Sequence, residues 1–141
     1  MSSFVLDNSV AMRWHLSAAK KIDQEYAEAV LIKLSETDAI VPELWHLEVV
    51  NVLVNAEKRG ETTMGEVESF ISQLEYLPIK VDSLTANKAF NRTITLARQY
   101  KLSSYDAAYL ELAMRTCFPL ATLDKDLKKA AIKAKVKIYL C

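Results

Sequence analysis

Short apolar runs alternate along the chain with longer segments whose apolar residues recur at helical spacing. Five runs have the composition of strands, the last at a sheet edge: residues 4–6, 39–41, 78–81, 119–122 and 136–139. Six segments are predicted helices: residues 9–14, 24–34, 63–74, 84–100, 103–116 and 124–135. In residues 84–100 the inward stripe is expected to include Ala86, Ala89, Phe90, Ile94 and Ala97. The alternation predicts one α/β domain over residues 1–141, with a mostly parallel sheet of four or five short strands flanked by helices.

The segment that follows Pro42 is apolar on nearly every side and meets no helix breaker before Gly60. Because a helix that is apolar all round is normally buried, we predict a buried helix from Pro42 to about residue 59. Glu48 lies in its middle, with Asn51 on the same side three residues later. An isolated buried carboxylate costs several kcal/mol, as an order of magnitude, unless it is paired or bound to a cation. Glu48 therefore needs a partner from elsewhere in the chain, or a metal ion.

Three further acids stand where a parallel sheet would bring them near Glu48. Asp7 directly follows the first strand, Asp124 comes two residues after the fourth, and Asp106 is in the first turn of a helix. Ligands of such sheets bind beyond the carboxyl ends of the strands, so all four acids can converge on one rim. Clustered carboxylates raise each other's pKa and cannot all stay ionised without a cation. Oxygen ligands favour Mg²⁺ or Mn²⁺, and an ion held in this way can activate water for attack on a phosphate.

Each acid also has a simpler explanation. Asp7 and Asp124 could cap helices, and Asp106 could act in a capping box with Ser103. Glu48 has no capping role in mid-helix, but an arginine could neutralise it; the candidates are Arg13 and Arg98. Asp82 also follows a strand, and a helix that begins near residue 84 explains it as a cap.

Composition narrows the functional classes. Apolar residues make up 51% of the chain, and 18 Lys plus Arg balance 18 Asp plus Glu, so no net field attracts nucleic acid or membrane. Two glycines exclude Gly-rich phosphate loops. The two cysteines have neither metal-ligand nor redox spacing, which suits a reducing cytosol. With no basic leader and no apolar run of membrane-spanning length, we expect a cytoplasmic protein.

The chain resembles the PIN domain family, and in particular the VapC-like toxins of bacterial toxin–antitoxin pairs. Four stretches in the family's order carry the resemblance: residues 4–10 (FVLDNSV), 41–53 (VPELWHLEVVNVL), 102–110 (LSSYDAAYL) and 120–127 (LATLDKDL). One departure is Asn8, where many members have a small residue or Thr, but Ser9 two positions after Asp7 fits the pattern. The resemblance implies a PIN-like three-layer fold and a ribonuclease that depends on Mg²⁺ or Mn²⁺.

By the family pattern, four residues are the catalytic and metal-binding acids: Asp7, Glu48, Asp106 and Asp124. Four more are expected around them: Ser9, Asn51, Thr122 and Asp126. The expected reaction is hydrolysis of an RNA phosphodiester, with Lys125 and Arg13 as candidates for phosphate contact. The resemblance further implies a small antitoxin as partner and a homodimer, for which residues 24–34 and 63–74 are candidate faces.

Other functions remain open from the residues alone. A PIN-like binding module with a silent site is the main alternative. Metal-free cleavage by His15 and His46 is a weaker one, because two histidines on different segments are more often structural. A phospho-accepting switch would need an acid pair after the first strand, where Asp7 stands alone. Trp14 and Trp45 are candidates for stacking on a base.

Overall fold

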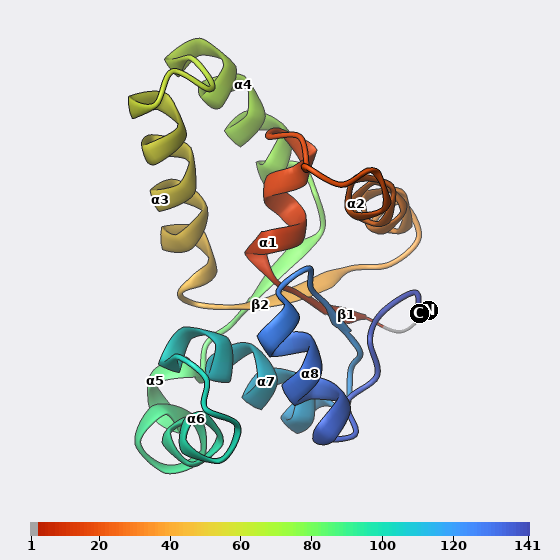
Figure 1. Cartoon of the computed structure of the whole chain (residues 1–141), viewed down its shortest axis with the longest axis vertical. Helices are drawn as coiled ribbons and strands as arrows, with labels where there is room; N and C mark the ends of the chain where they lie inside the picture. Colours follow the sequence, from red (N-terminus) through yellow and green to blue (C-terminus); the bar gives the residue numbers. More distant parts are fainter. Residues whose placement is uncertain (1–2) are drawn as a thin grey trace.

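Four short parallel strands form the centre of the computed structural model, which describes residues 3–141. Their spatial order is β3-β2-β1-β4 (Figure 1). In the register, Val5 of β1 lies opposite Ile40 of β2 and Leu120 of β4. The bounds are β1 (Phe4–Leu6), β2 (Ala39–Pro42), β3 (Ile79–Asp82) and β4 (Leu120–Ala121). The predicted α/β fold with a parallel sheet is confirmed.

Helices cover both faces of the sheet. Figure 1 shows α1 to α4 on one side and α5 to α8 on the other, which gives three layers. β1 is wholly buried, as expected for a strand covered on both faces. The bounds are α1 (Asn8–Ala11), η1 (Met12–Trp14), α2 (Lys21–Lys33), α3 (Trp45–Lys58), α4 (Met64–Glu75), α5 (Thr85–Lys88), η2 (Ala89–Thr93), α6 (Ile94–Tyr100), α7 (Ser104–Thr116) and α8 (Lys125–Lys133). Across residues 3–141, no helix has the length and apolar character needed to span a bilayer.

The helix after Pro42 differs from the prediction. Pro42 is the last residue of β2, and α3 begins at Trp45. One face of α3 is buried, through residues such as Val49 and Leu53. The opposite face is open, with Leu47 74% exposed and Val50 48% exposed. The expectation of a helix buried all round was wrong because α3 belongs to an outer layer and covers the sheet with only one side.

Residues 84–100 do not form one regular helix. They fold as α5, the π-helical turn η2 and α6. A π turn holds one residue more than an α turn and so rotates the face that follows it. Thr93 and Leu96 are buried as a result, whereas Phe90 is 94% exposed and Ile94 36% exposed. The predicted inward stripe was therefore wrong at these two positions and at Ala86, which is also exposed.

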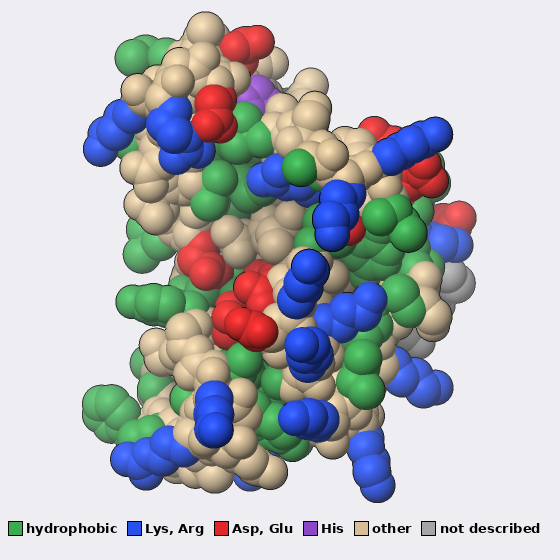
Figure 2. Space-filling view, in the orientation of Figure 1, with side chains coloured by type: hydrophobic (Ala, Val, Ile, Leu, Met, Phe, Trp, Pro, Cys, Tyr) green, Lys and Arg blue, Asp and Glu red, His purple; other side chains and the backbone are tan. Residues whose placement is uncertain are grey.

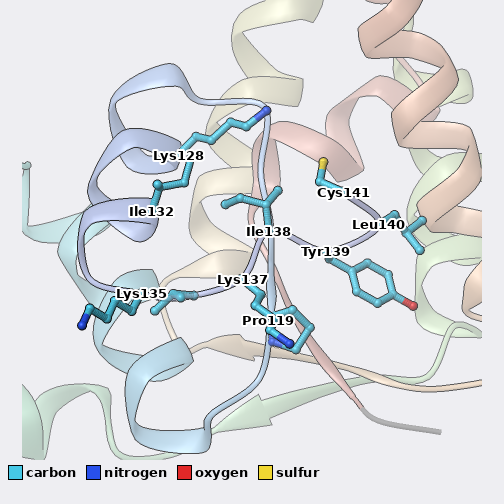
Figure 3. A pocket seen from close by; sticks show the side chains of 10 residues that line it. Pro119, Lys128, Ile132, Lys135, Lys137, Ile138, Tyr139, Leu140 and Cys141 are labelled. Carbon is cyan, nitrogen blue, oxygen red and sulfur yellow. The ribbon is translucent and has the colours of Figure 1, made fainter.

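The C-terminal segment is less regular than the predicted edge strand. Residues 136–139 contribute one bridge, between Ile138 and Leu120. Two hydrogen bonds fix it: Leu120 N–H donates to Lys137 O at 2.9 Å, and Tyr139 N–H donates to Leu120 O at 2.9 Å. An open groove of about 720 Å³ lies between this segment and α8, and Figure 3 shows the side chains that line it. The groove is lined by none of the four acids predicted for the site, which are Asp7, Glu48, Asp106 and Asp124. It is therefore distinct from the acidic rim of the sheet.

Candidate active site

The carboxyl ends of β1 and β4 lie side by side and bring two acidic segments together. Asp7 follows β1 directly, and its N–H donates to Ala121 O of β4 at 3.0 Å. The chain after β4 then carries Thr122 and Asp124 to the same rim. Acidic side chains gather at the centre of the face in Figure 2, where α3, α7 and α8 converge in Figure 1. This topology brings Asp7 and Asp124 to one rim of the sheet.

Asp7 is the most deeply buried of the four acids, with 2% of its surface exposed. Its Oδ2 accepts hydrogen bonds from Ser9 Oγ at 2.6 Å and from Thr122 Oγ1 at 2.7 Å. Neither hydroxyl reaches Oδ1. Burial raises the pKa of Asp7, and the two hydroxyl donors oppose that shift. Asp7 precedes α1 but its side chain makes no capping hydrogen bond, so the N-cap explanation fails for this residue.

The two hydroxyls that hold Asp7 also join the strand ends. Ser9 Oγ accepts from Leu123 N–H at 3.0 Å, and Thr122 Oγ1 accepts from Asp124 N–H at 3.0 Å. Each hydroxyl thus receives a backbone donor from the segment after β4 and gives its own proton to Asp7. This arrangement fixes the Asp7 carboxylate in one orientation, as expected of groups that surround a ligand carboxylate.

Glu48 is half-buried on α3 and is held by a tyrosine. Tyr109 Oη donates to Glu48 Oε1 at 2.5 Å. Burial raises the pKa of Glu48 to about 7, the Tyr109 hydrogen bond opposes the shift, and the charges of Asp7 and Asp106 add to it. Within residues 3–141, Glu48 forms no ion pair with lysine or arginine. The arginine explanation is wrong for Arg13, whose guanidinium donates to Ser17 O at 3.1 Å, and for Arg98, which is exposed on α6.

Asp106 and Asp124 complete the group from the starts of two helices. Asp106 N–H donates to Ser103 Oγ at 3.1 Å, so Ser103 caps α7, which is one half of the predicted capping box. Burial raises the pKa of Asp106 to about 6, and the nearby charges of Asp124 and Asp7 contribute. Asp124 caps α8 through Oδ1, which accepts from Leu127 N–H at 2.9 Å. The capping explanation thus holds for Asp124, and its Oδ2 is not used in the cap.

Asp82, the last residue of β3, is a carboxylate that a basic side chain of the same chain neutralises. Asp82 accepts two hydrogen bonds from the Arg115 guanidinium, at 3.0 and 2.8 Å. Arg115 lowers the pKa of Asp82. It also donates to Glu111, a buried acid on α7. No such cation serves Asp7, Glu48 or Asp106 among residues 3–141, and their pKa values are raised instead.

The donor set fits a hard divalent cation. The acids and the hydroxyls of Ser9 and Thr122 offer oxygen ligands, which is the chemistry that selects Mg²⁺ or Mn²⁺. As the side chains stand, no three His, Cys, Asp or Glu residues within residues 3–141 surround one point closely enough to hold an ion. The four acids therefore form an electrostatically coupled group rather than a finished coordination sphere.

Of the other predicted site residues, Asn51 and Arg13 contact different groups, and Asp126 and Lys125 are exposed close to the acids. Asn51 is exposed, and its Oδ1 accepts from Asn55 Nδ2 at 3.5 Å rather than contacting Glu48. Asp126 is exposed on the first turn of α8, and its charge contributes to the raised pKa of Asp106. Lys125 is exposed beside Asp124. Arg13 is turned to the backbone of the α1–α2 connection, so its predicted phosphate contact finds no support.

The aromatic and histidine alternatives lose their support. His15 hydrogen-bonds with Thr62 Oγ1 at 2.8 Å and stacks on Phe70, which is a structural role. His46 is exposed on α3 and packs edge-on against Trp45. Trp45 is only 3% exposed and cannot stack on a base, and Trp14 donates its indole N–H to Ala27 O at 2.8 Å.

Tyr109 is the site residue that the sequence prediction did not single out. It lies one helical turn after Asp106 on α7, so the two side chains share a face of that helix. This spacing is the signal that could have identified it. A tyrosine inside an apolar helix more often contributes only packing, and its hydroxyl direction depends on which helix packs opposite.

Basic side chains flank the acids on one side. Figure 2 shows lysine and arginine gathered over α8 and the α1–α2 connection, next to the acidic centre. The exposed lysines of α8 and the segment after it are Lys125, Lys128, Lys129, Lys133, Lys135 and Lys137. Although the chain has no net charge, this face has an acidic centre with a basic border of lysine and arginine side chains beside it.

A profile of the PIN domain family matches residues 4–133, a span that contains all four acids and Tyr109. No curated protein matches the chain. PIN domains are generally nucleases, and PIN nucleases typically use divalent metal ions. The three-layer fold, the parallel sheet and the acids at its carboxyl rim agree with this match over nearly the whole chain. The chain belongs to the PIN domain family.

Proposed function

We propose that this protein is an endoribonuclease that depends on Mg²⁺ or Mn²⁺ and acts as the toxin of a toxin–antitoxin pair. The observation that carries the nuclease assignment is a group of four carboxylates at the carboxyl rim of the sheet: Asp7, Glu48, Asp106 and Asp124. No basic side chain of residues 3–141 neutralises Glu48, in contrast to the Asp82–Arg115 pair. A divalent cation is the partner that this group lacks.

The roles of the chain's own residues follow from their contacts. A bound Mg²⁺ or Mn²⁺ would supply a Lewis acid for the scissile phosphate and make a water acidic enough to attack at neutral pH. Asp7, held through Oδ2, keeps Oδ1 for the ion. Asp124 has Oδ2 available and Glu48 has Oε2. Hydrolysis by in-line attack of water would leave 5′-phosphate and 3′-hydroxyl ends.

The basic border supports a polyanionic substrate. Lys125 stands next to Asp124, and the lysines of α8 continue away from it along one side of the site. Positive charge beside an acidic centre can hold the RNA backbone while the reacting phosphate reaches the ion. Lys125 is the residue that we assign to phosphate contact, and Arg13 is not part of this assignment.

The direct test is cleavage of RNA by the purified wild-type protein. We expect cleavage with Mn²⁺ or Mg²⁺, loss of cleavage in excess EDTA, and products that can be ligated through a 5′-phosphate. Cleavage that persists in EDTA would contradict the metal-dependent proposal and favour an acid–base mechanism without metal.

A binding module with a silent site is the remaining alternative. The full set of acids and the Ser9–Asp7–Thr122 hydrogen bonds argue against it, because a silent site has no need to keep buried, unneutralised carboxylates. Absence of cleavage in every divalent metal tested, together with retained RNA binding, would favour this alternative.

The toxin role implies a small antitoxin partner. We expect expression of this protein alone to arrest bacterial growth and co-expression of the small protein encoded beside it to relieve the arrest. Normal growth despite verified expression of an RNA-cleaving protein would contradict the toxin role and leave the nuclease assignment intact.

Residues 24–34 and 63–74 stay candidates for the homodimer face, and the exposed apolar side chains of α3, η2 and α6 offer a second candidate. These side chains are Leu47, Val50 and Val54 on α3, Phe90 on η2 and Ile94 on α6. We expect Phe90→Lys with Val50→Lys to shift sedimentation from dimer to monomer; an unchanged dimer would exclude this face.

A further inference from the structure

Tyr109 is buried where two of the helices that carry the acids, α7 and α3, meet. Its side chain is 0% exposed, although it comes from the same helix as half-buried Asp106. The phenol oxygen donates to Glu48 Oε1 at 2.5 Å. One hydroxyl thus joins α7 to α3.

The Tyr109 hydrogen bond leaves Glu48 with one free oxygen. Within residues 3–141, Tyr109 is the hydrogen-bond donor to Glu48, and it reaches Oε1 alone. Tyr109 is fully buried and its ring is packed in the core, so its hydroxyl is held in one place. A carboxylate that is held at one oxygen by a donor fixed in this way presents its other oxygen in a constant direction.

We propose that Tyr109 is a positioning residue that fixes Glu48 for cation binding through this hydrogen bond. Without the donor, the Glu48 side chain on α3 would rotate among several rotamers and would have to be ordered when the ion binds. A hydrogen bond to a charged acceptor is also stronger than one to a neutral acceptor, so the phenol favours the ionised carboxylate that an ion requires. The inference rests on the proposed function, because it concerns the same four acids.

Tyr109→Phe removes only the hydroxyl group that donates to Glu48 and keeps the ring that fills the core. We expect the dissociation constant for Mn²⁺, measured by calorimetry on metal-free protein, to rise by about 10- to 100-fold. Tyr26→Phe is the matched control, because Tyr26 is also largely buried and donates its hydroxyl to Tyr139 O at 2.8 Å, away from the acids. Tyr26→Phe should lower thermal stability by a similar amount and leave the Mn²⁺ affinity within about twofold of wild type.

A double-mutant cycle separates positioning from a general structural effect. If Tyr109 acts through Glu48, then adding Tyr109→Phe to Glu48→Gln should change the Mn²⁺ dissociation constant by less than about twofold, although each single change weakens it. Additive effects would overturn the inference, as would equal Mn²⁺ affinity of Tyr109→Phe and wild type. No Mn²⁺ binding by the wild-type protein would overturn the proposed function itself, and the inference with it.

Discussion

Asp7→Asn is expected to reduce RNA cleavage by at least about 1,000-fold, which corresponds to roughly 4 kcal/mol of transition-state stabilisation. The amide oxygen can still accept from Ser9 and Thr122, which now bond to Oδ2 of Asp7. The other position would carry an amide NH₂, which cannot bind a cation. The change therefore removes one ligand oxygen and one negative charge with little change of shape. Initial rates on a labelled RNA at saturating Mn²⁺ measure the effect.

The same substitution should stabilise the metal-free protein. Burial raises the pKa of Asp7, which means that the ionised carboxylate is unfavourable where the chain places it. Removing that charge is expected to raise the midpoint of thermal unfolding in EDTA at pH 8. Asp23→Asn, in the first turn of α2, is the control and should change neither property appreciably. A cleavage rate equal to that of wild type would exclude Asp7 from the site.

The stability of the metal-free protein should fall as the pH rises from about 4.5 to about 7. The folded-state pKa of Glu48 is raised from 4.5 to about 7, so the folded protein binds more protons than the unfolded chain within this window. A raised carboxyl pKa contributes a penalty that begins above the unfolded value and is complete above the folded value. Asp106, with its pKa raised to about 6, acts in the same direction.

Glu48→Gln isolates this contribution. After a discount for partial exposure of the side chain, we expect the variant to exceed wild type by about 1–2 kcal/mol in free energy of unfolding at pH 8 in EDTA. The two proteins should be equal near pH 4.5, where Glu48 is protonated. Glu68→Gln, an exposed change on α4, should show no such pH-dependent difference. Saturating Mg²⁺ should reverse the order at pH 8, because the ion stabilises wild type selectively. An equal difference at both pH values would contradict the pKa assignment.

The strands and the acids at their ends were predictable from the sequence because both depend on local pattern. A strand covered on both faces must be a short continuous apolar run, as Phe4–Leu6 is. The residue after such a strand lies at the carboxyl rim in any parallel arrangement. Asp7 and Asp124 could therefore be placed before the strand order was known.

The outer faces of the helices could not be predicted in the same way. Periodicity shows which residues of a helix are apolar. It does not show whether an apolar face packs in the core or is exposed for a partner, because both kinds of face have the same residue types. Leu47 and Val50 fit a buried helix equally well, and only the position of α3 in an outer layer leaves them exposed. Phe90 was misplaced for another reason, since the π-helical turn η2 shifts the helical register by one residue and leaves no mark in the apolar spacing.

Glu48 could be identified as anomalous from its apolar surroundings, but its contacts required the tertiary structure. Whether an arginine or a metal ion neutralises Glu48 depends on which helix packs against α3. That helix is α7, and it supplies Tyr109 rather than a basic residue. Hydrogen bonds between residues 61 positions apart leave no trace in local spacing.

The most direct test of the central claim is a crystal structure of the protein grown with Mn²⁺, with anomalous scattering used to locate the ion. We expect an anomalous peak within coordination distance of Asp7 and of at least one of Glu48, Asp106 and Asp124, beyond the ends of β1 and β4. A Mn²⁺ ion bound only elsewhere, or no peak at saturating Mn²⁺ while the four carboxylates stay as described, would contradict it.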